Sequence, residues 1–460
     1  MKALGHFLRS SLVLLLFLPS PTLAAEPLPT LDLLKKLIEL DTSNPPGNEK
    51  IAAEFLRDYL ASFGIASEIL ESAPGRANLV ARLKGSGERK SLLMLGHLDV
   101  VPAEAKDWQS PPFTPTIREG YLYGRGALDM KSLVAMEVQT FVKIHREGKP
   151  LQGDLVLALT ADEEAGAKFG AQFLIEQHWD KIAADYVLNE GSVGQDRKGK
   201  HLYPIQVAEK GVAWIRLKAQ GSPGHGSMPS KDNAVAILLT AMERLTGKQP
   251  PIRKTEISAE FLRRLADHES FPTSFAMRHL FSPPLRWLAG TFFADMIASD
   301  KVLNAMLRDT LVPTVLKAGF KTNVIPSEAV GEIDARLLPG RSPEEFLAEV
   351  QNKIEDLSVE AELLSQSQPD ASPFDTPFFA AFEQAIRQAD HQALVLPFIS
   401  PGATDSRFFR EKGIVAYGLI PLLLKPEDLA GLHGKDERIP VDELKRGEKI
   451  LNGVVSELLQ

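Results

Sequence analysis

Apolar residues recur along this chain with two different periods, and their alternation predicts the fold class. Segments with the spacing of a helix that buries one face are 31–40, 49–63, 129–144 and 167–177. Between them lie short apolar runs of the kind found in strands buried on both faces, namely 78–83, 91–96, 154–160 and 186–188. Strands that alternate with helices indicate an α/β fold with a mainly parallel sheet and helices on both faces.

The pattern changes near Glu209, because residues 212–219 partly alternate between apolar and polar, as in a strand with one exposed face. The elements predicted after it are a helix from Asn233, a strand over 328–338, a helix over 343–354 and a strand over 358–364. They indicate a small α+β domain with one open sheet. The α/β pattern resumes near Phe378, so the second domain is predicted to be inserted into the first.

Chain length supports two domains, because 460 residues are too many for one ordinary hydrophobic core. We assign residues 25–208 and 367–460 to the α/β domain and residues 209–366 to the inserted α+β domain. An aromatic-rich helical stretch at about 250–320 is interpreted as a further insertion within the second domain.

The first 24 residues have the pattern of a secretory signal peptide. Lys2 and Arg9 form a positively charged N-terminal region, residues 11–18 form a Leu-rich apolar core, and residues 22–24 offer a cleavage site. The apolar core is too short to span a bilayer. We expect cleavage before Ala25 and export to the periplasm or the exterior, with an uncleaved anchor helix as the alternative.

Composition excludes some classes of partner and ligand. Hydrophobic residues at 44% and charged residues at 24% are typical of a soluble enzyme. The formal net charge is −8 and basic runs are absent, so nucleic acid is not an expected partner. The chain has no Cys, which excludes disulfides and thiolate metal ligands. A zinc site would therefore need His, Asp and Glu.

Acidic and histidine residues follow several of the predicted strands. His97 and Asp99 come directly after the run 91–96 and, two residues apart, point to the same side of an extended chain. A carboxylate there can orient the His ring as a metal ligand. The other residues placed near strand ends, helix starts and loops are Asp129, Glu163, Glu164, Glu190 and His433. Ligands bind at strand ends of open α/β sheets, and this nitrogen and oxygen set suits zinc.

Each of these residues also has an ordinary structural explanation. A single acid at a helix start is usually a cap, and His433 alone would be an ordinary loop histidine. Residues 124–126 (Gly-Arg-Gly) suggest a dinucleotide loop, but Asp129 occupies the place of the third glycine. No Gly-x-Ser-x-Gly motif is present. The joint pattern favours a metal site.

Taken in order, these motifs resemble the co-catalytic dizinc metallopeptidases, the family of aminoacylase-1, acetylornithine deacetylase, succinyl-diaminopimelate desuccinylase and the glutamate carboxypeptidases. The motifs that carry the resemblance are residues 96–102, 124–131, 162–164, 189–191 and His433. Residues 224–229, 322–326 and 334–336 extend it into the inserted domain, which in this family is a lid and dimerisation domain. Residues 401–407 and the long insertion are similar to the branch of the Gly-X carboxypeptidase and the N-fatty-acyl-amino-acid hydrolase.

The resemblance implies a metal-ligand set. One zinc ion would bind His97 and Glu190, the other would bind Glu164 and His433, and Asp129 would bridge the two. Co²⁺ or Mn²⁺ are expected to substitute for zinc in vitro.

The resemblance also implies catalytic and substrate-binding residues. Glu163 would be the general base and Asp99 would orient His97. The residues implied in substrate binding are His225, for the oxyanion, Asn323, for a polar contact, and Arg336, for a substrate carboxylate.

The function expected from these features is metal-dependent hydrolysis of an amide bond next to a free carboxylate, with an N-acyl amino acid as the preferred substrate. A dipeptidase or carboxypeptidase of the same family is the alternative. A catalytically inactive periplasmic solute binder is an alternative of a different class, which the intact Glu163 disfavours. The partners expected are a small substrate and a second copy of the chain bound through the lid domain, without a stable membrane anchor.

Overall fold

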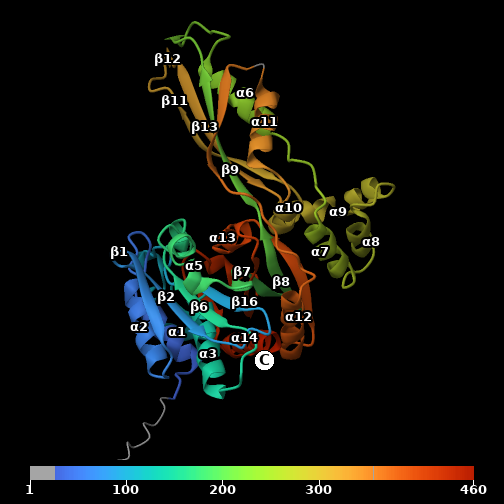
Figure 1. Cartoon of the computed structure of the whole chain (residues 1–460). Coiled ribbons are helices and arrows are strands. Elements are labelled where there is room, and N and C mark those ends of the chain that lie inside the picture. The colour runs from blue at the N-terminus through green and yellow to red at the C-terminus, as the bar shows by residue number, and fades with distance from the viewer. Residues whose placement is uncertain (1–25, 356) are drawn as a thin grey trace, which may run out of the picture.

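The computed structural model describes residues 26–355 and 357–460, so the expected signal peptide lies outside the described residues. A central sheet of eight strands has the order β1-β2-β6-β3-β7-β16-β8-β15 (Figure 1). Its strands are β1 (Ser67–Ala73), β2 (Arg76–Leu83), β3 (Leu92–His97), β6 (Leu155–Thr160), β7 (Tyr186–Arg197), β8 (Lys200–Glu209), β15 (Ala393–Ser400) and β16 (Val415–Leu424). In the middle of the sheet, β6, β3, β7 and β16 run parallel, whereas β1 and β2 are antiparallel.

Helices cover both faces of this sheet because its central strands are apolar on both sides. Leu92 and Met94 of β3 belong to one hydrophobic cluster, and the alternate residues Leu93 and Leu95 belong to another. The first cluster includes residues of α1 (Thr30–Glu39), α2 (Lys50–Ala61), α3 (Lys131–Glu147), α12 (Pro377–Ala389) and α14 (Val441–Leu459). The second includes residues of α4 (Ala171–Gln177), α5 (Trp179–Ile182) and α13 (Ser406–Glu411). The expected α/β class is therefore confirmed.

A second, smaller sheet extends away from the first (Figure 1). Its antiparallel strands, in spatial order, are β11 (Thr310–Ala318), β13 (Glu328–Leu337), β9 (Gly211–Gln220) and β14 (Val359–Gln366). Along β13 buried residues alternate with more exposed ones, and the buried face packs on α6 (Ala234–Thr246) and α11 (Pro343–Ile354). The side chains of Asn233 and Ser342 cap these two helices. We call this unit the lid; β10 (Gly224–His225) and β12 (Val324–Ile325) pair at its far end.

The insertion in the lid is helical over α7 (Glu256–Ala266), α8 (Thr273–His279), α9 (Arg286–Ser299) and α10 (Lys301–Leu307). Its helices end at Leu307, earlier than expected, because residues 310–318 form the edge strand β11. The insertion packs on the large domain, where the rings of Phe261 and Phe398 lie 6.4 Å apart. Arg264 also donates to the Val395 carbonyl at 3.1 Å.

The strand predicted at 186–188 is the start of the longer β7, which turns into β8. The apolar signal stops at Asn189 because the polar residues that follow include groups of the candidate site, while the backbone stays extended. Short strands β4 (Thr116–Arg118), β5 (Tyr121–Tyr123) and β17 (Arg438–Pro440) form a small separate sheet. In the described part of the chain, no helix is long and apolar enough to cross a bilayer.

Candidate metal centre

The predicted ligand residues come together at the carboxyl ends of the central strands. His97 is the last residue of β3, and Glu190 lies in β7. Glu164 lies in a 3-10 turn over Glu163–Ala165 directly after β6. Asp129 precedes α3, and His433 is in the loop before β17. The carboxyl ends of parallel strands lie at the same edge of the sheet, which explains why residues so far apart in sequence meet there.

Asp129 lies between the two histidines, and each of its oxygens faces a different ring. His97 Nε2 lies 3.2 Å from Oδ1, and His433 Nε2 lies 3.0 Å from Oδ2. Glu190 Oε1 lies 3.6 Å from the same nitrogen of His97. Glu164 Oε2 lies 3.2 Å from the same nitrogen of His433. The structure therefore offers two sets of donors that share one carboxylate.

These groups fit a bound divalent metal. Potential ligand atoms of His97, Asp129 and Glu164 lie within 4.8 Å of one another, as do those of His97, Glu163 and Glu190. The second oxygen of Glu164 is buried and has no hydrogen-bond partner among the described residues. So many acidic groups at one point repel one another unless cations or protons compensate them.

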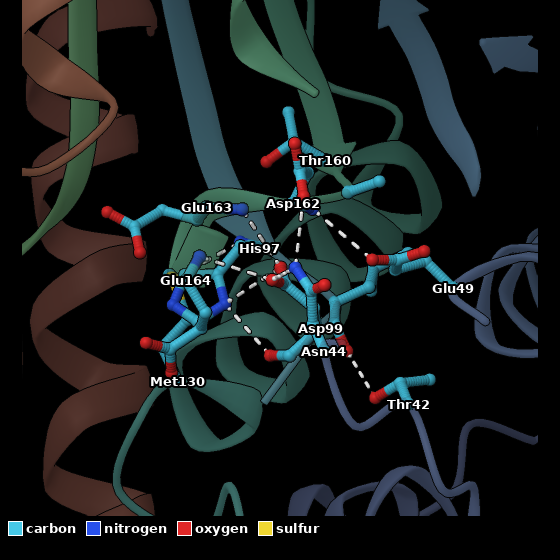
Figure 2. A network of polar contacts seen from close by, with 12 residues as sticks. Thr42, Asn44, Glu49, His97, Asp99, Met130, Thr160, Asp162, Glu163 and Glu164 are labelled. Atoms are coloured by element: carbon cyan, nitrogen blue, oxygen red, sulfur yellow. Dashed lines mark hydrogen bonds and ion pairs between the residues drawn. The ribbon is translucent and has the colours of Figure 1, made fainter. Parts of the chain in front are cut away.

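Asp99 holds His97 and the turn that carries Glu163 and Glu164 (Figure 2). Its side chain is fully buried and accepts from the backbone N–H groups of Glu163 and Glu164, each at 3.1 Å. Asn44 Nδ2 donates to it at 2.9 Å. His97 Nδ1 lies 3.5 Å from Asp99 Oδ1 and 3.0 Å from its carbonyl oxygen, so Nε2 is left facing Asp129. This fixes the ring as a metal ligand requires.

A buried ion pair supports the same turn from behind. Arg76 donates to both oxygens of Glu49, at 2.8 and 2.7 Å, and to Asp162 Oδ1 at 2.8 Å. Asn44 also donates to Asp162, at 3.0 Å. In Figure 2 the Glu163 carboxylate points away from this network. The turn is therefore fixed by its neighbours, while Glu163 itself extends toward the open side of the site.

Glu437 fixes the segment that carries Asp129. Its buried carboxylate accepts from the backbone N–H groups of Leu128 at 2.6 Å, Asp129 at 3.0 Å and Gly126 at 3.0 Å. Arg125 Nη1 donates to it at 2.7 Å. Sequence reasoning did not identify this residue, because nothing in the local pattern links it to a segment about 300 residues earlier.

Glu437→Ala should lower the free energy of unfolding by about 3–5 kcal/mol, because it leaves the buried guanidinium of Arg125 without its counter-charge. Urea unfolding followed by circular dichroism measures this effect. The matched control is Glu39→Ala, which removes an exposed partner of Lys36 and should cost less than about 1 kcal/mol. Equal losses in the two variants would contradict the structural role of Glu437.

In the absence of a metal, bound protons offset the negative charge of the clustered carboxylates. Hydrogen bonds with Asp129 and Glu164 raise the pKa of His433 to about 10. Burial lowers the pKa of His97, but its contacts with Asp129 and Asp99 outweigh that effect and raise it well above the ordinary value. Burial also raises the pKa of Glu190 to about 8.

Metal binding should therefore release protons. With its pKa near 10, His433 holds its proton at pH 7.5, whereas a histidine at the ordinary value is mostly neutral there. A metal binds only the neutral ring, so it must displace that proton, and apparent affinity should rise with pH until His433 has titrated. Calorimetric titration in two buffers of different ionisation enthalpy measures the release. Identical enthalpies in both buffers would show that no proton leaves.

A cleft of about 680 Å³ lies between the candidate metal-ligand residues and the lid. Glu163, Glu164 and His433 line it from the large domain, and Trp214 and Arg336 line it from the lid. Arg336 is already paired, because its Nε and Nη2 donate to the two carboxylate oxygens of Asp334, at 2.7 and 3.2 Å.

A second arginine lines the same cleft. Arg407 follows the segment 401–406, stacks on Phe408 at 4.5 Å, and makes no ion pair with any described residue. The segment is held by the buried carboxylate of Glu209, which accepts from Thr404 N at 2.9 Å and from Arg410 at 2.8 Å. Sequence analysis noted this segment only as a branch motif. The structure makes Arg407 a cationic group available to an anion in the cleft.

His225 and Asn323 lie together at the far end of the lid, where β10 pairs with β12 (Figure 1). The Gly226 N–H donates to the Asn323 carbonyl at 2.9 Å, and the Ser227 hydroxyl lies 2.8 Å from His225 Nδ1. Neither residue lines the cleft of its own chain in this structure, and both are exposed. Their role in substrate binding stays a prediction.

The sequence is similar to those of known proteins. The profile of "Peptidase family M20/M25/M40" matches residues 93–457. The N-fatty-acyl-amino acid synthase/hydrolase PM20D1 of Xenopus tropicalis is 31% identical over 77% of this chain and 69% of its own length. Mouse aminoacylase-1 is 25% identical over 94% of this chain and 95% of its own length.

Solved structures share the fold. An M20 metallo-carboxypeptidase from Sulfolobus solfataricus superposes with a TM-score of 0.69 at 18% identity, covering 93% of this chain and 98% of its own. Human carnosine dipeptidase 1 gives a TM-score of 0.63 at 18% identity over 93% of this chain and 95% of its own. The resemblance found in the sequence is confirmed. On the match of the family profile to most of its length, the chain belongs to peptidase family M20/M25/M40.

Proposed function

We propose that the protein is a zinc-dependent amidohydrolase that cleaves N-acyl amino acids. The observation that carries this proposal is Asp129, whose two oxygens face His97 and His433 beside a cleft that holds Glu163. The relatives named above, an N-fatty-acyl-amino acid synthase/hydrolase and an aminoacylase, support the choice of substrate class.

The metal ligands in this proposal are the residues brought together at the strand ends. His97 and Glu190 would hold one zinc ion, Glu164 and His433 would hold the other, and Asp129 would be shared. When bound, two such ions polarise the amide carbonyl and lower the pKa of water toward ~7. Co²⁺ or Mn²⁺ would substitute in vitro.

Glu163 would act as the general base. It lies next to a metal ligand in sequence, lines the cleft and points away from the supporting hydrogen bonds. Burial and the nearby Glu190 carboxylate raise the pKa of Glu163 well above its ordinary value in the metal-free cluster. When it is ionised, this carboxylate would take a proton from water. It would then give that proton to the leaving amine. Asp99 would keep His97 oriented through this sequence.

The substrate carboxylate would bind to an arginine of the cleft. Arg336 was predicted for this role, but using it requires competition with Asp334. Arg407 lines the same cleft and forms no ion pair with a described residue, although the carboxylates of Asp405 and Glu411 interact with it at longer range. Arg336→Leu and Arg407→Leu should therefore both be measured. The variant whose KM rises more, with little change in kcat, identifies the carboxylate-binding residue.

A substrate screen tests the proposed function. N-acetyl amino acids, long-chain N-acyl amino acids and dipeptides are compared at equal concentration with the zinc-loaded protein. The proposal expects higher kcat/KM for N-acyl amino acids. Faster cleavage of dipeptides would favour the peptidase alternative, which the family match also allows. No hydrolysis of any of them, with metal bound, would favour the solute binder.

A homodimer formed through the lid would place His225 of one subunit beside the cleft of the other. Along the edge strand β11 and the turn after it, Val312, Leu316 and Phe320 are exposed, as expected of a face that a second copy covers. His225 and Asn323 lie at the lid's far end, so they would serve the partner's cleft, where the histidine would stabilise the oxyanion. Light scattering measures the state in solution.

Export is the remaining part of the proposal. The N-terminal pattern supports cleavage near Ala25 and release to the periplasm or the exterior. N-terminal sequencing of the exported fraction should begin there, and finding Met1 on soluble cytoplasmic protein would contradict it.

A further inference from the structure

The first strand of the lid presents two apolar side chains to the cleft. Val212 and Trp214 of β9 both line it, and residues two apart in a strand point to the same face of the sheet. In Figure 1, β9 continues from β8 of the large domain into the lid, so its first residues lie beside the cleft. Trp214 is 42% exposed, which leaves much of its ring available to a ligand. We call these two residues the apolar wall.

The apolar wall is not part of the hydrophobic core of the lid. The neighbouring residues Ala213 and Ile215 are fully buried and belong to the cluster that includes residues of α6 and α11. Because side chains alternate along a strand, Val212 and Trp214 face the other side of the sheet. No hydrophobic cluster among the described residues includes Trp214. Packing of the lid therefore does not account for a tryptophan at this position.

Farther along β9 the same face is charged. Arg216 pairs with Glu332 at 3.1 Å, and Lys218 pairs with Glu328 at 2.8 Å. Such polar side chains are typical of a strand face that meets water. The outward face of β9 is therefore apolar only next to the cleft, where a substrate would cover it.

The rest of the cleft offers little apolar surface. Phe408 is the other large apolar side chain that lines it, and the Arg407 guanidinium lies 4.5 Å from the centre of its ring. The Arg336 guanidinium lies 6.0 Å from the centre of the Trp214 ring, beside the apolar wall. A site that combines an apolar surface with a few charged groups suits a ligand that has an apolar group near an anion.

We propose that Trp214, together with Val212, binds an apolar group of the substrate and so determines which substrates are cleaved fastest. This inference rests on the proposed function. An N-acyl amino acid carries two such groups, the acyl chain and the amino-acid side chain, and either would leave water when it packs against the indole. Substrates that differ in only one of these groups distinguish the two.

Trp214→Ala tests the apolar wall with three substrates, namely N-acetylglycine, N-decanoylglycine and N-acetylphenylalanine. The variant should lose at least about ten-fold in kcat/KM for one or both of the substrates with a large apolar group. Its kcat/KM for N-acetylglycine should change by less than about three-fold, because that substrate has no such group. Loss with N-decanoylglycine assigns the wall to the acyl chain, and loss with N-acetylphenylalanine assigns it to the side chain.

Two further variants serve as controls. Trp214→Phe keeps an aromatic ring and should change kcat/KM by less than about three-fold for every substrate. Trp287→Ala removes a tryptophan that is 74% exposed on the insertion and does not line the cleft, so all three values should stay unchanged. Thermal unfolding shows that each variant is folded.

The inference is overturned if Trp214→Ala lowers kcat/KM equally for all three substrates, since that pattern indicates a general disturbance of the site. It is also overturned if no substrate is affected, or if Trp287→Ala has the same effect as Trp214→Ala.

Failure of the proposed function gives a different result, because it is seen in the unmodified protein. If that protein cleaves dipeptides but no N-acyl amino acid, Trp214→Ala should show the same loss for glycylphenylalanine or phenylalanylglycine relative to glycylglycine. If it cleaves neither class, these compounds are stable ligands, and the loss should appear in their affinity measured by calorimetry. In each case an equal effect on all compounds, or no effect, overturns the role of the apolar wall.

Discussion

Glu163→Gln should lower kcat by about 10²–10⁴-fold while both metal ions stay bound. The amide keeps the size of the carboxylate and still accepts a hydrogen bond, but it cannot take a proton from water. The side chain lines the cleft and points away from the network around Asp99, so the substitution leaves the fold of the turn unchanged. Steady-state kinetics and metal analysis by mass spectrometry measure the two properties separately.

Glu164→Gln is the matched control, because the same substitution is made one residue away. The Glu164 carboxylate lies 3.2 Å from His433, and its other oxygen is buried without a hydrogen-bond partner in the described part of the chain, as expected of a ligand. This variant should lose metal, because a neutral amide is a poorer zinc ligand. If Glu163→Gln loses metal and Glu164→Gln keeps it, the two roles are reversed. If both variants stay fully active, the catalytic site lies elsewhere.

Asp129→Asn should weaken the binding of both ions by more than about 100-fold, a larger effect than loss of a residue that only supports a ligand. The reason is geometric, because each oxygen of Asp129 faces a different histidine. His433→Ala, by contrast, should weaken binding of one ion only. Metal content after dialysis against a weak chelator distinguishes these outcomes.

Asp436→Asn is the control for this prediction, since it makes the same change close to His433. Its carboxylate accepts from the Gln109 N–H at 2.8 Å and takes no part in the cluster. It should retain both ions. If Asp129→Asn loses only one ion, the carboxylate is not shared, and the two-ion arrangement must be redrawn.

Local patterns predicted the parts of this site that depend on one segment. The run 91–96 is apolar at every position except Ser91 and Gly96, so it predicts a strand buried on both faces with His97 directly after it. The ligand residues were found because each belongs to a short motif. Their convergence then follows from the parallel order of β6, β3 and β7.

Residues that act across long sequence separations could not be predicted. Glu437 contacts the Asp129 segment only in the folded chain, and Arg76 joins Glu49 to Asp162 in the same way. The strand β8 was missed because Pro204 and Gln206 interrupt its apolar residues, so its sequence shows neither a continuous apolar run nor a regular alternation. The place of His225 relative to the metal ligands depends on how the lid and a partner are arranged, which no local pattern encodes.

Metal titration of hydrolysis tests the two-ion account most directly. The mature protein is stripped with a chelator, verified metal-free by mass spectrometry, and supplied with zinc in small steps while hydrolysis of its best N-acyl amino acid is followed. The account predicts no hydrolysis without metal and a plateau at two zinc ions per chain. Full hydrolysis in the verified metal-free protein, or a plateau at one ion, would contradict it.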